Sequence, residues 1–100
     1  MEFKKVFISQ PMRNKTDEEI KKERENIISQ VKDHFGEDVE IIDSFKKELK
    51  NNNPVYSLGT SLQMLSEADL AVFAKGWNEA NGCSIEHKVC ENYGIAIWEL

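Results

Sequence analysis

The expected fold of this chain follows mainly from LAVFAKGWNEANGCSIEHKVCENYGIAIW, residues 70–98. It opens with a continuous apolar run, 70–74, which is typical of a strand buried on both faces. A polar loop over 75–82 leads to a helix expected over about 83–93, and a glycine then ends that helix. A second apolar run follows over 95–100. This succession of strand, helix and strand predicts a right-handed crossover within a parallel sheet.

The residues before this stretch repeat the alternation of strand and helix. Their expected elements are a strand over 4–9, a helix over about 17–35, a strand over 39–45, a polar loop over 46–56, and a helix from Pro54 to about Ala68. A capping box of Thr16 and Glu19 marks the start of the first helix, and Gly36 its end. The order βαβαβαβ predicts an α/β protein, a three-layer flavodoxin-like (Rossmann-like) sandwich. Its four-stranded parallel sheet has the expected order 2-1-3-4.

Length and composition predict one soluble domain that spans residues 1–100. The chain has 100 residues and a formal net charge of -5, so neither a nucleic-acid footprint nor a polybasic membrane patch is expected. Its apolar runs are far shorter than the ~20 residues of a membrane span, and its N-terminus does not resemble a signal peptide. We therefore expect a cytoplasmic protein whose two cysteines are free thiols.

Ligands of such sheets bind beyond the carboxyl ends of the strands, where the strand order switches. Here these ends carry the loops SQPMRNK (9–15) and KGWNEANG (75–82). Both lead into helix starts, whose backbone N–H groups suit a phosphate or a carboxylate. In the second loop Asn81 is the expected N-cap, Gly82 allows close approach to the backbone, and Ser84 adds a hydroxyl. Arg13 and Lys15 offer positive charge from the first loop. The alternative is that these residues only cap their helices.

The helix over 83–93 carries the candidate chemistry. Glu86, about one turn from its start, is either a nucleophile or general base in the crevice or a solvated surface residue. Cys83, His87 and Cys90 lie along one helix face, but a zinc site needs a fourth ligand and usually a second segment. We therefore expect an apolar stripe and neither metal nor cofactor. Trp77 is either a lid over a stacked ring or a hydrophobic plug.

Two stretches resemble the nucleoside 2-deoxyribosyltransferase superfamily. VFISQPM (6–12) is similar to a first strand and loop of the YISGPM or YLAGPF type, and residues 65–98 are similar to the second half of such domains. The run GWNEANGCSIEH (76–87) is closest to a short phage and bacterial subgroup. The resemblance implies binding of a nucleoside or nucleotide and cleavage of its N-glycosidic bond, or deoxyribosyl transfer.

The resemblance also implies roles for individual residues. Glu86 is the implied nucleophile and Asp69 the acid that handles the base, although the position of Asp69 at the start of a strand also fits a structural role. The implied substrate-binding residues are Ser9, Gln10, Pro11, Met12, Arg13, Gly76, Trp77, Asn81, Gly82 and Ser84. Gln10 stands where a glycine is usual, and Phe7 where a tyrosine often orients the nucleophile.

Two further expectations concern activity and assembly. The enzyme hypothesis rests on Glu86, whereas Gln10 and Phe7 favour a nucleotide-binding module that senses or sequesters its ligand without turnover. A homodimer or larger homo-oligomer is expected from the superfamily and from apolar residues on more than one side of the second helix. These residues are Tyr56, Leu58, Leu62 and Met64.

Overall fold

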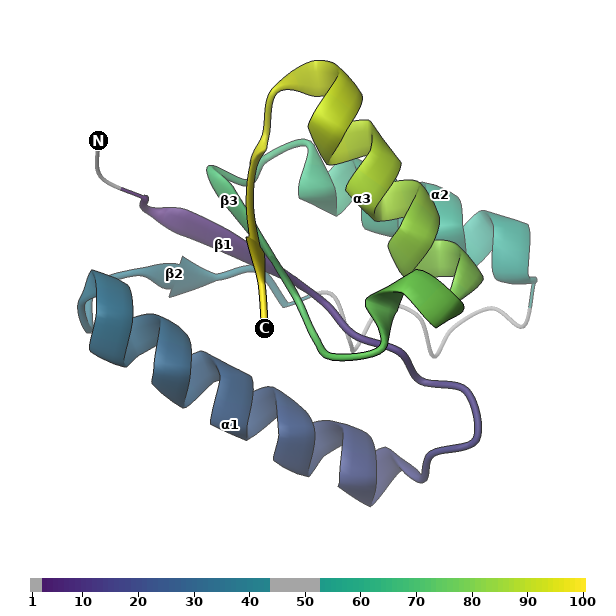
Figure 1. Ribbon diagram of the computed structural model, residues 1–100, viewed down its shortest axis with the longest axis horizontal. Coiled ribbons are helices and arrows are strands. Elements are labelled where there is room, and N and C mark those ends of the chain that lie inside the picture. Colours follow the sequence, from purple (N-terminus) through teal and green to yellow (C-terminus); the bar gives the residue numbers. More distant parts are fainter. Residues whose placement is uncertain (1–2, 44–52) are drawn as a thin grey trace.

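The structure, a computed structural model, describes residues 3–43 and 53–100 (Figure 1). Its elements in chain order are β1 (Lys5–Ser9), α1 (Asp17–Phe35), β2 (Glu40–Ile41), α2 (Pro54–Leu65), β3 (Leu70–Phe73), the short 3-10 helix η2 (Trp77–Glu79), α3 (Asn81–Tyr93) and β4 (Ala96–Glu99). The strands form one sheet in the order β2-β1-β3-β4, and every neighbouring pair is parallel. The predicted fold class and strand order are therefore confirmed.

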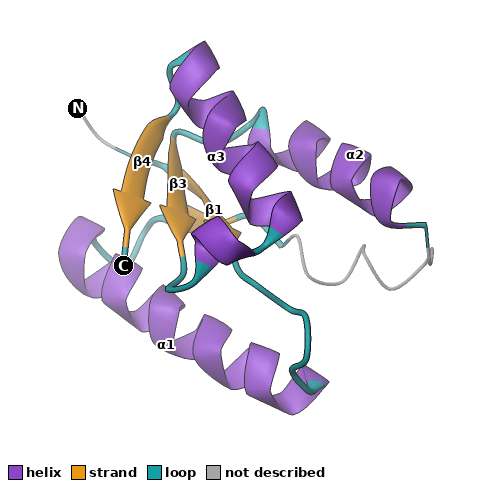
Figure 2. Cartoon of the chain, turned by 45° about the vertical axis from the view of Figure 1, so that its right-hand side comes forward, coloured by secondary structure: helices purple, strands orange, loops and turns teal. Residues whose placement is uncertain are grey.

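Helices cover both faces of the sheet: α1 lies on one face, and α2 and α3 lie together on the other (Figures 1 and 2). Because side chains alternate along a strand, each central strand contributes side chains to the core layers on both faces of the sheet. The α1 layer joins Ile27 and Val31 to the strand residues Val6, Ile8, Leu70 and Val72. The opposite layer joins Met64, Leu65 and Cys90 to Phe7, Ala71 and Phe73. Position 9 has the same parity as Phe7, so its side chain belongs to the α2–α3 face.

The first helix begins and ends as the sequence predicts. Thr16 Oγ1 accepts a hydrogen bond from the backbone N–H of Glu19, and Glu19 Oε1 accepts one from the backbone N–H of Thr16. These hydrogen bonds to Thr16 hold the pKa of Glu19 below its usual value. At the other end Gly36 has φ 109°, a backbone conformation that favours glycine. The capping box thus fixes where the chain turns from the first loop into α1.

The second strand and second helix are shorter than expected. β2 has two residues, against an expected strand over 39–45, of which 44–45 lie outside the described residues. The backbone carbonyl of Ile42 accepts a hydrogen bond from Arg24 Nη2, so a side chain replaces the next pairing at this sheet edge. α2 ends at Leu65 rather than near Ala68. Of the expected loop over 46–56, residues 46–52 lie outside the described part, and the rest caps and begins α2.

The third helix starts earlier than expected, and its N-cap is Ala80 rather than Asn81. The prediction was wrong because the expected loop contains η2, which brings the chain into helical geometry two residues before Cys83. Asn81 is therefore the first helical residue, and the cap at Ala80 makes no side-chain hydrogen bond. Gly94 closes the helix with φ 77°, as expected.

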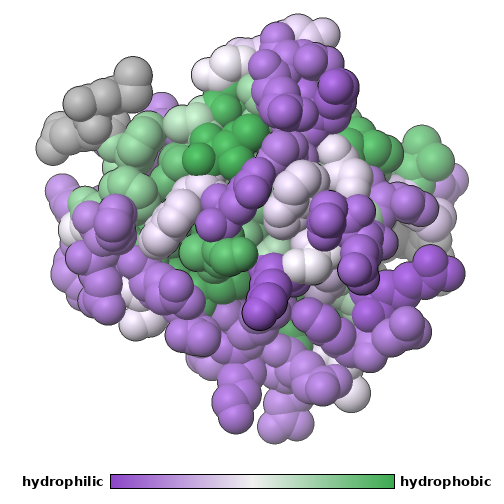
Figure 3. Space-filling model, viewed as in Figure 1, coloured by the Kyte–Doolittle hydropathy of each residue, from purple (hydrophilic) through white to green (hydrophobic). Residues whose placement is uncertain are grey.

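The last strand, β4, lies at an edge of the sheet and in front in the view of Figure 1. The space-filling view of this face shows apolar residues gathered around its middle and hydrophilic residues over α1 (Figure 3). The residues of β4 before Glu99 are half-buried, as an edge strand with helices on both faces should be. Among the described residues, no helix combines the length and apolar character that crossing a membrane requires.

Candidate functional site

A cleft of about 1000 Å³ lies at the carboxyl edge of the sheet. Its walls come from the loop after β1, the loop after β3 and the starts of α2 and α3. The lining includes Ser9 to Lys15, Pro54, Val55, Ser57, Leu58, Ser61, Lys75, Gly76, Glu79 to Cys83, Ile85 and Glu86. The two loops expected to hold a ligand thus meet in one cavity, as the strand order requires.

Glu86 lies at the wall of this cleft and is buried, with 7% of its surface exposed. Its Oε1 accepts a hydrogen bond of 2.6 Å from Ser9 Oγ, at the carboxyl end of β1. Ser9 is itself only 1% exposed. The structure therefore does not support the interpretation of Glu86 as a solvated helix residue, and the hydroxyl of Ser9 is committed to Glu86.

The start of α3 forms the part of the cleft wall suited to an anion. Asn81 and Gly82 occupy its first positions and line the cleft. The first N–H groups of a helix have no acceptor within the helix, and the helix dipole favours negative charge there. A methyl group at position 82 would meet no described atom within 4 Å beyond its chain neighbours and its own helix backbone. The glycine therefore leaves room for a ligand over the backbone.

The loop after β1 supplies the opposite wall. Pro11 and Met12 are half-buried and Arg13 is exposed, and all three line the cleft as predicted. The backbone N–H of Lys15 bonds to the Met12 carbonyl and closes a turn in which Asn14 has φ 64°. This turn carries Arg13 to the rim, where its charge favours an anionic ligand group.

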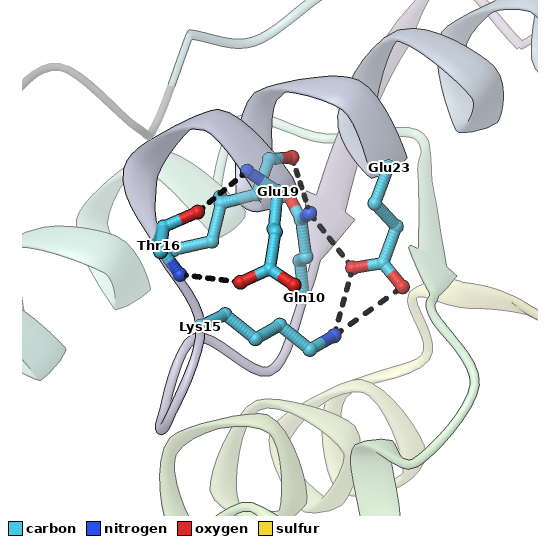
Figure 4. A network of polar contacts seen from close by, with 6 residues as sticks. Gln10, Lys15, Thr16, Glu19 and Glu23 are labelled. Carbon is cyan, nitrogen blue, oxygen red and sulfur yellow. Dashed lines mark hydrogen bonds and ion pairs between the residues drawn. The ribbon is translucent and has the colours of Figure 1, made fainter.

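Gln10 is tied to α1 (Figure 4). Its Nε2 donates to the Ile20 carbonyl and to Glu23 Oε1, each at 2.8 Å. Glu23 Oε1 also accepts a hydrogen bond of 3.2 Å from Lys15 Nζ. Gln10 Oε1 is buried and has no hydrogen-bond partner within the described parts of the chain. The amide thus fastens the cleft loop to the first turns of α1, and Lys15 is partly neutralised by Glu23.

Two predicted ligand contacts have local structural roles instead. Trp77 does not line the cleft: its ring stacks on His87 with centroids 3.8 Å apart and an interplanar angle of 5°. Of the two interpretations of Trp77, the structure supports the plug. Ser84 Oγ lies 3.4 Å from the carbonyl oxygens of both Trp77 and Asn78, so its one proton is shared between them and joins η2 to α3. Gly76, with φ 89°, does line the cleft and makes the turn that this arrangement needs.

Asp69 is not near Glu86, which corrects the expectation that both belong to one site. Asp69 Oδ2 accepts the backbone N–H groups of Lys4 and Lys5, at the start of β1. Glu86 meets the same strand at its end, four residues later, or about 13 Å along the strand. These backbone hydrogen bonds hold the pKa of Asp69 below its usual value. Asp69 borders a more open hollow of about 700 Å³ at the amino edge, where its carboxylate secures the backbone.

The stripe of Cys83, His87 and Cys90 packs against the sheet. His87 Nε2 lies 2.8 Å from Glu99 Oε2 of β4, and Phe73 contacts the histidine ring edge-on. Both cysteines are buried thiols that form no disulfide. Burial, followed by the negative charge of Glu86, raises the pKa of Cys90 to about 11. Within residues 3–43 and 53–100, no three His, Cys, Asp or Glu side chains are grouped to hold a metal ion.

Sequence reasoning missed part of the cleft and the partner of Glu86. The walls from α2, with Val55, Leu58 and Ser61, carry no motif, and their place depends on how α2 packs against α3. Ser9 was expected to contact a ligand, but its hydroxyl contacts Glu86. The alternation of side chains along a strand could have indicated this contact, because it places Ser9 on the same face of the sheet as Phe7, the face that α3 covers.

Comparison of the chain with family models, with curated proteins and with solved structures finds no match. The resemblance to nucleoside 2-deoxyribosyltransferases therefore stays a prediction that rests on the motifs in residues 6–12 and 65–98.

Proposed function

We propose that the cleft binds a nucleoside or nucleotide and that the Glu86 carboxylate attacks the anomeric carbon of its sugar. The observation that carries this proposal is the buried Glu86, held by Ser9 at 2.6 Å in the wall of the cleft. A buried carboxylate in a concave site, fixed by a neighbouring hydroxyl, is the arrangement that a nucleophile needs. The sequence resemblance supplies the substrate class.

The proposed reaction has two balanced steps. A Glu86 oxygen forms a bond to the anomeric carbon while the bond from that carbon to the base nitrogen breaks, and the electron pair leaves with the base. Water then attacks the same carbon and releases Glu86 as a carboxylate. The two protons of that water end on the sugar hydroxyl and on the base. If a second base attacks in place of water, the outcome is deoxyribosyl transfer.

The charge around the cleft favours a ligand with an anionic group. Arg13 and Lys75 are exposed at its lining, and the start of α3 adds backbone donors. Pro11, Met12 and Ile85 give the lining apolar surface for a sugar or base. We therefore expect nucleotides to bind more tightly than the corresponding nucleosides.

A second candidate function is nucleotide binding without turnover, in sensing or sequestering. The position of Asp69 at the opposite edge favours it, because the acid implied by the resemblance is then missing from the cleft. Among the described residues that line the cleft, the other carboxylate is Glu79, which is exposed on η2. Turnover therefore depends on whether the base leaves without help from a second buried acid.

A homo-oligomer is part of the same proposal. Val55, Tyr56 and Ile85 are 78%, 61% and 43% exposed, and Val55 and Ile85 border the cleft. Met64, expected at the surface, is buried instead and belongs to the core below α2. Light scattering that gives twice the chain mass of 11.5 kDa or more at micromolar concentration would support the oligomer. The monomer mass would count against it.

The test combines binding with release of base. Thermal shift with nucleosides and nucleotides identifies the ligand, since a ligand held 100-fold above its Kd stabilises the fold by about 2.7 kcal/mol. The best ligand is then incubated with the protein and free base is measured by chromatography. We expect Glu86→Gln to keep binding and to lose release by about 1000-fold or more, because an amide is a poor nucleophile.

Glu25→Gln, an exposed change on α1 outside the cleft lining, is the matched control and should release base like the wild type. Undiminished release by Glu86→Gln would eliminate Glu86 as the nucleophile. Binding without release by the wild type would favour the second candidate function.

A further inference from the structure

We propose that Ser9 is the positioning residue of Glu86: its hydroxyl aims the carboxylate into the cleft and favours the ionised form. The catalytic meaning of this inference rests on the proposed function. The coupling between the two side chains is a property of the folded protein and is testable without turnover.

The backbone holds Ser9 rigidly. It is the last residue of β1, its Cα pairs with that of Phe73, and its carbonyl accepts the Ala74 N–H at 2.9 Å. At Ser9 the paired neighbour is β3, and the side chain of Ser9 points to the α2–α3 face, as that of Phe7 does. The hydroxyl is therefore a fixed point of the sheet rather than part of a mobile loop.

The contact has the geometry of a hydrogen bond to a charged acceptor. The Ser9 Oγ to Glu86 Oε1 distance is 2.6 Å, within the about 2.5–2.7 Å of an O–H···O⁻ bond and at the short end of the about 2.5–3.0 Å of O–H···O bonds in general. Serine has one hydroxyl proton, and an ionised carboxylate only accepts, so this bond is made best when Glu86 is ionised. A nucleophilic carboxylate needs this state at neutral pH.

Within β1, position 9 and not position 7 supplies the donor to Glu86. Phe7, two residues earlier on the same strand face, offers no donor, and the Cys90 thiol on the same helix is a weak one with a pKa of about 11. At position 7 the resemblance expects a tyrosine hydroxyl. In this chain the first strand provides its hydroxyl at position 9 instead, still on the face that meets α3.

The test follows the titration of the Glu86 carboxyl by carbon NMR in the full chain, with glutamates labelled and Glu86 assigned through Glu86→Gln. We expect Ser9→Ala to raise the pKa of Glu86 relative to the wild type, because the lost bond stabilised the charged form. Ser9→Thr keeps the hydroxyl and should titrate like the wild type. Ser66→Ala removes an exposed serine hydroxyl at the end of α2 and serves as the control.

An unchanged Glu86 titration in Ser9→Ala would overturn the proposal, as would an equal shift in Ser66→Ala. A shift in Ser9→Thr as large as in Ser9→Ala would also overturn it, because the hydroxyl would then not be responsible. If Ser9→Ala does not fold, Ser9→Cys takes its place, since it keeps the side-chain shape with a somewhat larger atom and donates only weakly.

The activity arm uses the four common deoxynucleoside 5′-monophosphates as probes. If the wild type releases base, Ser9→Ala should lower kcat by about 10- to 100-fold with little change in KM, as expected for a lost hydrogen bond to a charged group. An unchanged kcat would overturn the positioning role. If the wild type releases no base from these probes, the proposed reaction on them fails, while the NMR result still decides the coupling of Ser9 to Glu86.

Discussion

Among single residues, Glu86 and Asp69 are both tied to β1 but at opposite ends. Glu86 is buried and meets a side-chain hydroxyl at the carboxyl end of the strand. Asp69 is exposed and meets two backbone N–H groups at the amino end. The first arrangement suits chemistry on a ligand, whereas the second joins the start of β3 to the start of β1.

Asp69→Asn should weaken the fold at neutral pH and leave ligand chemistry unchanged. The pKa of Asp69 is lowered from 3.8, so its charge stabilises the folded state above that pH, and the contribution is lost as pH falls through the folded pKa. The deficit of the variant should therefore be present at pH 7 and shrink towards pH 3. Urea unfolding at the two pH values measures it, with Glu25→Gln as the control. A deficit that grows towards acid pH would contradict this account.

Cys90 should be unreactive in the folded protein. Its pKa of about 11 leaves about one thiolate in a thousand at pH 8, and the residue is 1% exposed. We expect iodoacetamide to modify it on the order of 100-fold more slowly in the folded than in the denatured chain. Peptide mass spectrometry at timed intervals gives both rates. Equal rates would show that the thiol is neither shielded nor held protonated.

Among the elements, the helix starts determine the shape of the cleft. The capping box of α1 fixes the end of the first loop, and Gln10 ties that loop to the same helix. At α3 the capping depends on η2, through the Ser84 hydroxyl bonds and the stack of Trp77 on His87. The GWNEANGCSIEH run is thus a structural unit, in which the tryptophan and the histidine hold the loop that carries the cleft wall.

Thr16→Ala should destabilise the protein by about 1 kcal/mol, because it removes the acceptor for the Glu19 N–H at the start of α1. Ser29→Ala, at an exposed interior position of the same helix, is the control and should be neutral or slightly stabilising. Chemical denaturation of both variants gives the free energies of unfolding. A Thr16→Ala loss no larger than the Ser29→Ala effect would mean that the cap adds nothing to global stability.

Across the whole molecule, stability should be greatest in the central strands. β1 and β3 have fully buried residues along almost their whole length and a strand on each side. β2 is a two-residue strand at one edge, and β4 is half-buried at the other. The carboxyl ends of the two stable strands carry the cleft, so the candidate site rests on the most rigid part of the fold.

Hydrogen exchange should follow this order. We expect the amides of Phe7 and Val72, in the strand centres, to exchange only through global unfolding, and that of Glu40 in β2 to exchange through local opening at lower free energy. NMR-detected exchange in increasing denaturant separates the two regimes. Equal opening free energies at Glu40 and Val72 would contradict the expected difference in stability between the central and edge strands.

The α/β class, the strand order and most helix bounds could be predicted from the amino-acid sequence. Apolar runs, caps and terminal glycines act over a few residues, and the handedness of crossovers then leaves few arrangements of the sheet. The position of the cleft followed from the same rule. The N-cap of α3 was missed, because η2 is held by Trp77 packing on His87 and not by local capping residues.

Which side chains meet at the site depends on the packing of the whole fold. Ser9 and Glu86 are 77 residues apart in the chain, and their contact depends on the register of β1 and on the rotation of α3 about its own axis. The same long-range packing placed Asp69 at the opposite edge and turned Trp77 away from the cleft. Local sequence patterns specify the helices and strands and the faces that they bury. A contact of 2.6 Å between residues distant in the chain depends instead on how the helix and sheet layers pack in three dimensions.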